Sequence, residues 1–568
     1  MKGADYIIDF LADKGVCHIF GYPGAVVCHL MDSAYKHNKI KLHLNYHEQA
    51  SAFAACGYAI STGKVAVAYA NGGPGMTNLV TGIADAWYDS LPVIFIVGQV
   101  DTTAMRNELL IRQRGIQEIP SAKIVKEIVK YSDVISDVSK LRFCIEKAYY
   151  KAISGRPGPV LLEIPADIQR ADIDIENSVS FNPDATIKDD RGLDEYMAVV
   201  EKALKEADRP CILIGNGVKV SGNYPALIPM VKHLRIPVLS TLPALDCLPF
   251  EHSLNFGFVG NNGNRYSNFI LGKSDLIISV GCRMDVKVVG NERNTFATNA
   301  KFIRVDVDEK ELTYKVRDDE IDICADAGKF IKSLTTLEYN KDNSDWIGVC
   351  KRLKEKFYRY DFKEYHNILQ LLLNKADRAS CFTTDVGQHE IYTLQALQLK
   401  KEQRIAISSG LASMGFGIPA AIGAYYLSEK PVVCVCGDGG FLMNVQELQY
   451  IARERIPIKI IVFNNNSLGM IREFQTRNFE GKCVHSTGEF GYECPDIKAI
   501  SDSYGLDYKK VKNMDDAKKI DMNSDLPFII ELLVDEPTEL YPRFRRGFKV
   551  QDMVPEISTN DYEWAMKL

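Results

Sequence analysis

Short apolar runs alternate with helical stretches along the first third of the chain. Runs at 16–20, 41–45, 65–70 and 93–97 are each followed by a glycine-containing turn or by a segment with helical periodicity. The block closes with another apolar run at 160–164. Strands that alternate with helices predict a parallel sheet covered by helices on its faces.

The same alternation of apolar runs and helical stretches occurs twice more along the chain. Apolar runs at 211–214, 237–240, 276–280 and 302–307 form a second block, and runs at 381–384, 431–436, 458–463 and 528–533 form a third. A polar stretch at 171–192 reads as a linker, and a charged helical stretch near 343–375 leads into the third block. We therefore expect an α/β protein with three doubly wound parallel-sheet domains at 1–170, 190–342 and 360–545, followed by a C-terminal tail at 546–568.

Length and composition agree with this division. A chain of 568 residues has room for about three domains. With 46% hydrophobic and 25% charged residues, it resembles ordinary globular proteins and not disordered, collagen-like or coiled-coil chains. A net charge of -6 and a pI near 6.0 argue against nucleic acid as a partner.

The cysteines and the apolar segments bear on the compartment. Fourteen cysteines form no CxxC pair, and Cys434 and Cys436, which alternate within an apolar run, are expected to be buried thiols and not ligands; this usage favours a reducing compartment such as the cytoplasm. Asp5, Asp9 and Asp13 near the start are atypical of a signal peptide, and no apolar window is long enough for a membrane span. Aromatic and basic residues interleave after Pro537, so we expect a tail folded over the body and not a membrane-binding patch.

The strongest local signal joins two strand ends in the third block. One predicted strand ends at Gly437-Asp438-Gly439-Gly440, and a helix is expected from about Asn444 to Arg453. The next strand ends at Asn464-Asn465-Asn466. Asp438 and Asn465 would therefore both leave the carboxyl ends of parallel strands, where open α/β sheets bind their ligands.

This combination suits a magnesium-bound diphosphate. Carboxylate, amide and backbone carbonyl oxygens are the hard ligands that Mg²⁺ prefers, with phosphate oxygens and water completing an octahedron. Gly439 and Gly440 would let the backbone approach the phosphates, and the following helix N-terminus favours their negative charge. Taken singly, each half also fits a tight turn or an ordinary loop.

With these residues in place, the pattern resembles the signature of thiamine diphosphate enzymes. The resemblance implies that Asp438, Asn465 and the backbone carbonyl of Ser467 ligate magnesium. It also implies that Glu48, at the start of an Ala-rich helix, is the catalytic carboxylate set against the cofactor's aminopyrimidine. Without the resemblance, Glu48 would read as a helix N-terminal residue stabilised by the dipole.

Further segments match the same family. Met414, within Met414-Gly415-Phe416-Gly417, would prop the cofactor into a bent form, although a core methionine is the commoner fate of such a residue. The resemblance assigns the other cofactor-binding positions to Gly24, Ala25, Pro74, Asn78, Val386, Gly387, Gln388, His389, Gly437, Leu468, Gly469 and Met470.

Within that family the chain is most similar to the acetolactate synthase large subunits, over about residues 1–550. This similarity implies a carboligase that decarboxylates pyruvate, a 2-keto acid, and transfers the two-carbon acyl carbanion to a second carbonyl. Gln117 would act beside Glu48 near the aminopyrimidine. The three domains would be pyrimidine-binding, central and diphosphate-binding. A homodimer or homotetramer with the active site at the subunit interface is implied as well.

The central domain of these enzymes often holds FAD. The resemblance assigns tentative FAD contacts to Gly215, Asn216, Gly217, Gly260, Gly263, Arg283 and Asp306. Glycines of this kind are individually weak signals, because a lone Gly-x-Gly is usually a turn.

Three departures concern the acceptor. Lys287 stands where synthases usually have arginine, Phe474 replaces a common tryptophan, and Ile116 replaces a pocket phenylalanine. Lysine keeps the charge of arginine but loses its bidentate fork. Three alternatives therefore stand beside the synthase reading: acetyl transfer from pyruvate to a keto sugar or other acceptor in polysaccharide biosynthesis, a flavoenzyme of the pyruvate oxidase type, and a non-catalytic binding protein.

Overall fold

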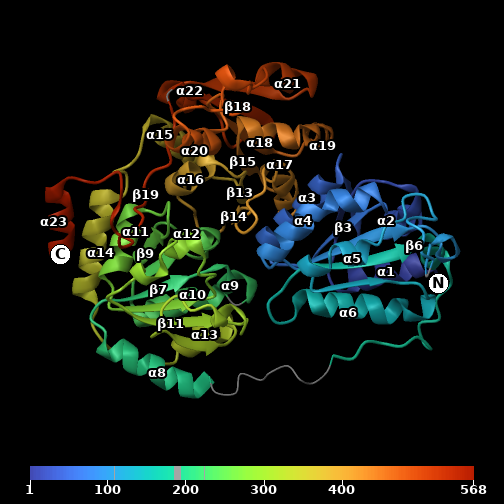
Figure 1. Ribbon diagram of the computed structural model, residues 1–568, viewed down its shortest axis with the longest axis horizontal. Coiled ribbons are helices and arrows are strands. Elements are labelled where there is room, and N and C mark those ends of the chain that lie inside the picture. Colours follow the sequence, from blue (N-terminus) through green and yellow to red (C-terminus); the bar gives the residue numbers. More distant parts are fainter. Residues whose placement is uncertain (108, 184–192, 223, 536) are drawn as a thin grey trace.

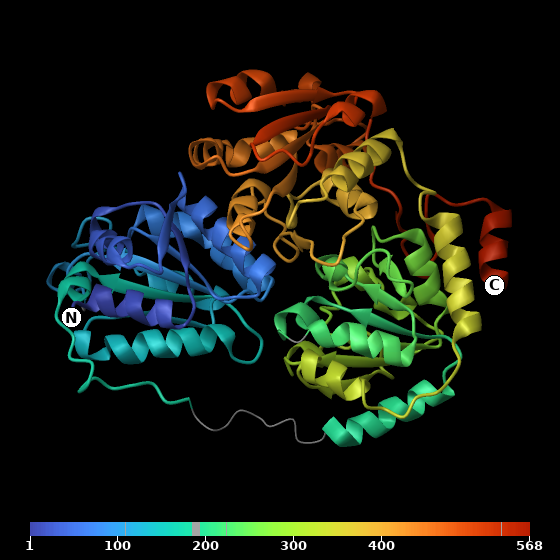
Figure 2. The same ribbon diagram turned by 180° about the vertical axis from the view of Figure 1, so that it is seen from behind.

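The computed structural model describes residues 1–107, 109–183, 193–222, 224–535 and 537–568. Three six-stranded sheets, each covered by helices, follow one another along the chain (Figures 1 and 2). Every strand pairing within the three sheets is parallel. The predicted fold class, three doubly wound α/β sheets, is confirmed.

The first sheet has the strand order β2-β1-β3-β4-β6-β5. Its strands are β1 His18–Gly21, β2 Lys41–Leu44, β3 Ala66–Ala70, β4 Val93–Gln99, β5 Tyr131–Val134 and β6 Val160–Pro165. Its helices are α1 Gly3–Asp13, α2 Cys28–Lys36, α3 Glu48–Thr62, α4 Pro74–Tyr88, α5 Ser121–Ile124, α6 Leu141–Ile153 and α7 Ala166–Arg170. The order reverses between β1 and β3, and such switch points are where open α/β sheets bind ligands.

The central sheet has the order β12-β11-β10-β7-β8-β9 and reverses between β7 and β10. Its strands are β7 Pro210–Ile214, β8 Val238–Ser240, β9 Asn255–Phe258, β10 Leu276–Val280, β11 Lys301–Asp306 and β12 Ile321–Cys324. Its helices are α8 Leu193–Glu206, α9 Asn216–Val220, α10 Leu227–Leu234, α11 Arg265–Lys273, α12 Val286–Val289 and α13 Ala327–Leu334.

The third sheet has the order β14-β13-β15-β16-β18-β17 and reverses between β13 and β15. Its strands are β13 Cys381–Thr384, β14 Arg404–Ala406, β15 Val432–Gly437, β16 Ile458–Asn464, β17 Asp507–Val511 and β18 Phe528–Leu533. Its helices are α15 Glu364–Lys375, α16 Gln388–Ala396, α17 Gly417–Tyr425, α18 Asp438–Met443, α19 Leu448–Glu454, α20 Gly469–Asn478, α21 Ile497–Ser503 and α22 Met514–Lys519.

Each sheet separates two hydrophobic cores. In β4, Ile94 and Ile96 join one core, whereas Phe95 and Val97 join the core on the opposite face. Successive side chains of a strand point to opposite faces, so a strand covered by helices on both sides is apolar throughout. This is why the predicted strands appear as continuous apolar runs and not as alternating patterns.

The strongest runs were located well, and weaker strands were missed. The predicted strands at 276–280, 381–384 and 528–533 coincide with β10, β13 and β18. No distinct apolar run marks the strands β5, β9, β12, β14 and β17. All five lie at sheet edges, and they are short strands of three to five residues, most of them only partly buried, which leaves little apolar pattern to detect.

Two helix predictions need correction. The stretch at 343–375 is two helices, α14 (Ser344–Phe357) and α15, separated by a turn. The helix expected from about Asn444 to Arg453 is also wrong in extent. Helix α18 begins at Asp438 itself, a 3₁₀ turn follows at Val445–Glu447, and α19 then runs over Leu448–Glu454. Asp438 therefore occupies the first turn of a helix and not a loop before one.

Helices α3 and α17 join the first and third sheets, and Figure 1 shows them side by side near the centre of the molecule. Glycines allow their backbones to meet. A Cβ added at Gly57 would lie 2.5 Å from Ala420 Cα, and one added at Gly423 would lie 2.8 Å from the carbonyl carbon of Ala54. The contact leaves no room for side chains at these two positions.

The tail is folded over the body, as expected. Strands β19 (Arg543–Phe544) and β20 (Met553–Val554) pair, and α23 (Thr559–Lys567) lies beside α14 in Figure 1. Val550 and Ala565 are buried in a core of the central sheet. Within the described ranges, no helix is long and apolar enough to cross a bilayer. The predicted linker at 171–192 lies partly outside the described residues.

Candidate active site

The switch point of the first sheet gathers several predicted residues. Gly24 follows β1 and Asn71 follows β3, and a Cβ on Gly24 would lie 2.5 Å from Asn71. Asn71 Oδ1 accepts a hydrogen bond from the Val26 amide at 3.1 Å. Ala25 begins the 3₁₀ turn between these residues. Only glycine permits such an approach between the two loops.

Gln117 lies at the same place. Its side-chain Oε1 accepts from Asn71 Nδ2 at 2.7 Å, and a Cβ on Gly73 would lie 2.7 Å from Gln117 Cβ. The backbone φ of Gln117 is +63°, a left-handed conformation that non-glycine residues seldom adopt. Strain of this kind concentrates at functional sites. Asn71 links the two loops, and sequence reasoning did not single it out.

Glu48 is the first residue of α3. The side chain of His47 caps the helix by accepting from the Gln49 amide at 3.1 Å. Asn78 Nδ2, from α4, donates to Glu48 Oε2 at 2.9 Å, and a Cβ on Gly75 would lie 3.1 Å from Glu48 Oε1. Pro74 begins α4 and helps to set its start. The carboxylate is thus oriented by one amide and is partly open to solvent.

The switch point of the third sheet forms a second half-site. Gly437 ends β15, and a Cβ there would lie 2.9 Å from His389 Nδ1. A Cβ on Gly440 would lie 2.8 Å from the Asp385 carboxyl carbon, and Asp385 in turn accepts from the Gly415 amide at 2.9 Å. The loops after β13 and β15, including Val386 and Gly387, therefore meet with no space for larger side chains.

Asp438 and Asn465 leave adjacent strands, because Gly437 of β15 pairs with Phe463 of β16. Asp438 is almost completely buried, and burial raises the pKa of its carboxyl to about 6. Its Oδ2 accepts from the Ser467 amide at 3.1 Å. Asn465 Nδ2 donates to Thr538 Oγ1 at 2.9 Å. The structure thus brings Asp438 and Ser467 together, with Asn465 on the neighbouring strand end.

Gln388 closes this half-site from the side of α16. Thr538 Oγ1 donates to Gln388 Oε1 at 2.6 Å, and Gln388 Nε2 donates to Glu473 at 2.7 Å. A Cβ on Gly469 would collide with Gln388 and lie 3.1 Å from Asn465 Nδ2. Thr538 was not predicted, because it stands in a loop without a motif.

Two apolar side chains converge over Gly439. A Cβ there would lie 2.5 Å from Leu468 Cδ2 and 3.5 Å from Met414 Cε. Met414 is therefore at the half-site and not in a remote core. Met470, two residues beyond Leu468, is 41% exposed.

The half-site fits a magnesium diphosphate. Two buried polar atoms, His389 Nε2 and Ser467 Oγ, have no hydrogen-bond partner among the described residues, which is costly unless a ligand satisfies them. Burial lowers the pKa of His389 to about 4, and a hydrogen bond to the Asp385 backbone opposes this fall. Among the described residues no group of three or more His, Cys, Asp or Glu could hold a metal, so the candidate ligands are one carboxylate, one amide and backbone oxygen.

The glycines predicted for FAD have another explanation. Gly217 donates from its amide to the Gly281 carbonyl at 2.9 Å, and a Cβ on Gly215 would lie 2.5 Å from Cys282 Cα. Gly260 packs against the Lys287 carbonyl, and a Cβ on Gly263 would lie 2.6 Å from the Val259 backbone. Backbone packing at the switch point of the central sheet thus accounts for these four glycines without a flavin.

Three polar residues predicted for FAD already contact the protein. Arg283 Nη1 donates to the Tyr88 carbonyl at 2.8 Å, and Asn216 Nδ2 lies 3.5 Å from the Asp89 carbonyl. Asp306 accepts from the Asp308 amide at 2.9 Å, and burial raises its pKa. The first two contacts reach across to the first sheet, so the flavin candidates lie between two sheets.

The three acceptor candidates have separate surroundings. Lys287 Nζ donates to the Ser409 carbonyl at 2.9 Å, close to the Met414 segment. Phe474 is 58% exposed and meets Phe479 edge-on, and Ile116 is 85% exposed beside Gln117. Side chains this exposed complete a pocket only if something else covers them.

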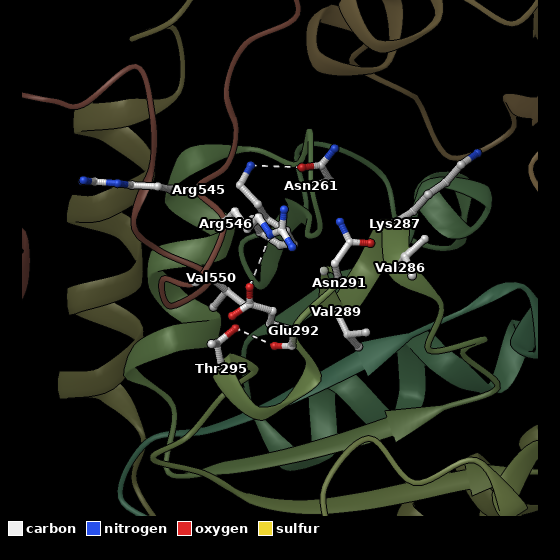
Figure 3. Close-up of a pocket in the computed structure, with 13 residues that line it drawn as sticks. Asn261, Val286, Lys287, Val289, Asn291, Glu292, Thr295, Arg545, Arg546 and Val550 are labelled. Carbon is white, nitrogen blue, oxygen red and sulfur yellow. Dashed lines mark hydrogen bonds and ion pairs between the residues drawn. The ribbon is translucent and has the colours of Figure 1, made fainter. Parts of the chain in front are cut away.

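A cavity of about 220 Å³ lies between α12 and the tail, lined by residues that include Asn261, Asn291, Glu292 and Arg546. Figure 3 shows Arg546 pointing toward Glu292, with which it pairs at 3.6 Å, while the Lys287 ammonium points away from them. Lys287 is therefore directed toward the third sheet and away from this cavity.

Comparison with known proteins agrees with the two half-sites. Residues 1–124 match the family model "Thiamine pyrophosphate enzyme, N-terminal TPP binding domain", 197–334 match its central domain and 385–532 match its C-terminal TPP binding domain. The chain is 34% identical to the acetolactate synthase isozyme 2 large subunit of Escherichia coli (strain K12), over 98% of this chain and 100% of that one. It is also 34% identical to the acetolactate synthase large subunit of Lactococcus lactis, over 99% and 97%.

A third relative, the probable acetolactate synthase large subunit of Methanocaldococcus jannaschii, is 35% identical over 98% of this chain and 96% of the relative. The similarity therefore spans all three sheets in one order and at nearly full length. The chain belongs to the family of thiamine pyrophosphate enzymes that includes the acetolactate synthase large subunits.

Proposed function

We propose that this protein is a thiamine diphosphate-dependent carboligase that forms acetolactate from two molecules of pyruvate. The observation that carries the proposal is the pair of half-sites at the switch points of the first and third sheets, one built around Glu48 and the other around Asp438. Similarity to acetolactate synthases over nearly the whole chain supports the same reaction.

Each half-site has a distinct part in binding. Asp438, Asn465 and Ser467 would hold Mg²⁺, with His389 and Gln388 lining the diphosphate end of the site. Glu48 would hold a proton against the aminopyrimidine, oriented by Asn78 and with Gln117 close by. Met414 and Leu468 would support the middle of the cofactor. When bound, thiamine diphosphate supplies a nucleophilic carbon and an electron sink for decarboxylation.

The active site is completed by a second copy of the chain in this proposal. Large apolar side chains are exposed beside both half-sites, namely Leu109, Leu110, Ile111 and Ile116 on the first and Met443, Met470, Ile471, Phe474 and Phe479 on the third. Apolar surface of this extent marks an interface. A homodimer or homotetramer would cover Phe474 and Ile116 and so form the acceptor pocket with Lys287.

Mixed dimers test this arrangement. Glu48→Gln and Asp438→Asn proteins, each inactive alone, would be mixed, dissociated and reassociated. A site shared between chains regains activity in mixed dimers, because one of their two sites carries both native residues. Sedimentation gives the size of the assembly. Activity that stays absent in verified mixed dimers would contradict a shared site.

The central sheet is proposed to bind FAD between itself and the first sheet, through Arg283, Asn216 and Asp306. The glycines add no support, so the proposal rests on these side chains and their position at the switch point. Flavin absorbance released on denaturation tests it.

The domains are proposed as 1–170, 190–342 and 360–545. A cytoplasmic location is supported by fourteen free cysteines.

Product analysis tests the reaction itself. Incubation with pyruvate, thiamine diphosphate and Mg²⁺ should release carbon dioxide and form acetolactate in equal amounts, as measured by mass spectrometry. Carbon dioxide without acetolactate would refute the carboligase. The Glu48→Gln variant is the matched control, because it preserves the size of the side chain and removes its acidity.

A further inference from the structure

Glu447 is a buried acid that the proposed reaction does not use. It is fully buried in the 3₁₀ turn Val445–Glu447 that follows α18. Its Oε1 accepts from the Tyr46 backbone amide at 2.8 Å, and its Oε2 accepts from Asn45 Nδ2 at 2.9 Å. Both donors belong to the first sheet. Glu447 therefore reaches from the diphosphate half-site to the other half-site.

The two donors lie in the segment that leads directly to Glu48. Asn45, Tyr46 and His47 connect β2 to α3, and the first residue of α3 is Glu48. The Glu447 carboxylate thus holds the backbone two residues before the proposed catalytic carboxylate. A shift of this connection would move the start of α3, and Glu48 with it.

A second side chain of the same segment holds the other side of Glu48. Asn444 Nδ2 donates to the Gly415 carbonyl at 2.7 Å and lies 3.4 Å from Gln49 Oε1. Asn444 is itself fixed, because Gln446 Nε2 donates to its Oδ1 at 2.9 Å. Contacts from one short segment therefore bracket Glu48, at Tyr46 and at Gln49.

We propose that Asn444 and Glu447 form a clamp that positions Glu48 for its work on the cofactor. The proposal rests on the function proposed above, since the clamp matters only if Glu48 acts as the acid-base group. These are positioning residues, because they contact the Glu48 segment and not the reacting atoms. Helix α18 begins at Asp438 and ends directly before Asn444, so the clamp joins the metal-binding turn to the Glu48 helix.

The energetic cost argues for a specific role. Burying a carboxylate is unfavourable, and burial raises the pKa of Glu447 to about 7 while the hydrogen bonds from Asn45, Tyr46 and His47 oppose this rise. The same two sheets are also joined by His43 and Tyr450, whose side chains meet at 2.9 Å. That contact does not touch the connection before Glu48, so it provides a control.

The test compares Glu447→Ala, Glu447→Gln and Tyr450→Phe. The alanine variant removes both contacts of the clamp at Tyr46 and Asn45. The glutamine variant can restore them, because its carbonyl accepts from the Tyr46 amide and its NH₂ can donate to Asn45 Oδ1, which has no partner within the part of the chain that the structure describes. Tyr450→Phe removes a hydrogen bond between the same two sheets without touching the clamp.

The first readout uses the protein without cofactor. Amide hydrogen exchange of the peptide containing Tyr46 should accelerate in Glu447→Ala and stay near the native rate in Glu447→Gln and Tyr450→Phe. The second readout is the exchange of the thiazolium ring proton of bound thiamine diphosphate without pyruvate. A small misplacement of a catalytic group costs roughly ten- to a hundredfold in rate, and we expect that loss in Glu447→Ala alone, with the cofactor dissociation constant unchanged.

The outcomes separate the clamp from the proposed function. If the native protein accelerates ring-proton exchange and Glu447→Ala does so equally, the clamp is overturned and the function stands. Equal losses of exchange rate in Glu447→Ala and Tyr450→Phe would also overturn it, because they would indicate that any contact between the two sheets has the same effect. If the native protein itself fails to accelerate the exchange, the proposed function falls and the clamp falls with it.

Discussion

Replacing glycine by alanine should change stability in opposite directions at two helix positions, one at the contact between α3 and α17 and one away from it. Gly423→Ala places a methyl group at the contact of α17 with α3, at 2.8 Å from the Ala54 carbonyl carbon and 2.9 Å from the Tyr58 nitrogen. Gly348→Ala places the same group on α14, where the nearest atom is Arg352 Nη1 at 3.7 Å. Both glycines lie inside helices, so helix propensity acts equally on both.

Helix propensity and packing together set the expected stability changes of the two variants. Alanine is favoured over glycine inside a helix by about 1 kcal/mol, so Gly348→Ala should stabilise by about that amount. At Gly423 the same gain opposes a clash, because carbon atoms normally approach no closer than about 3.5 Å and the obstructing atoms are backbone. Overpacking of a tight core costs roughly 1–3 kcal/mol, and a clash with backbone atoms belongs at the upper end, so Gly423→Ala should be destabilising by about 2 kcal/mol overall.

Urea unfolding followed by far-UV circular dichroism measures both effects. The transition of the first and third sheets should move to lower urea in Gly423→Ala, and the transition that includes α14 should move to higher urea in Gly348→Ala. Gly57→Ala, on the facing helix, serves as a second test of the contact, since its Cβ would lie 2.5 Å from Ala420 Cα. If Gly423→Ala were as stable as the native protein, the backbone contact between the helices would be refuted.

Three further predictions concern the site. Glu48→Gln should abolish acetolactate formation in the product assay while leaving the thermal midpoint within a few degrees, because the glutamine can still bond Asn78. Lys287→Ala should raise the KM for the acceptor pyruvate more than it lowers carbon dioxide release, because the ammonium contacts the Ser409 carbonyl and none of the proposed metal ligands. Burial raises the pKa of Asp438 to about 6, so its carboxyl is protonated below that pH. Mg²⁺ needs the carboxylate, and titration calorimetry should therefore show Mg²⁺ affinity rising with pH through about 6. Affinity independent of pH there would contradict the role of Asp438 as a ligand.

Much of the fold could be predicted from the sequence, because buried parallel strands appear as continuous apolar runs. The runs at 276–280 and 528–533 are apolar at all but one position each, since helices cover both faces of their sheets. Edge strands such as β5 and β17 carry polar residues that are only partly buried or exposed, and they show no such apolar run. The helix after β15 begins at Asp438 and not near Asn444, and the sequence did not indicate this because Gly439 and Gly440 in its first turn have weak helix propensity.

The site divides in a similar way. Glu48, Asp438 and Asn465 belong to short motifs whose residue types follow from the chemistry of Mg²⁺ and a diphosphate, so a local stretch of sequence was enough to find them. Asn71, Thr538 and Glu447 act through partners far away in the chain, at Gln117, Gln388 and Tyr46. No local pattern marks such residues.

The sequence by itself determined the βα rhythm, the three sheets and the two motifs, because strand burial and ligand chemistry both act over a few neighbouring residues. Only the tertiary structure decided which loops meet. The switch point of each sheet brings Gly24 to Asn71, Gly215 to Gly281 and Gly440 to Asp385, and the packing of α3 on α17 brings Glu447 to the segment before Glu48. These contacts depend on sheet order and helix packing, which arise from burial summed over whole domains and leave no signature at any single position.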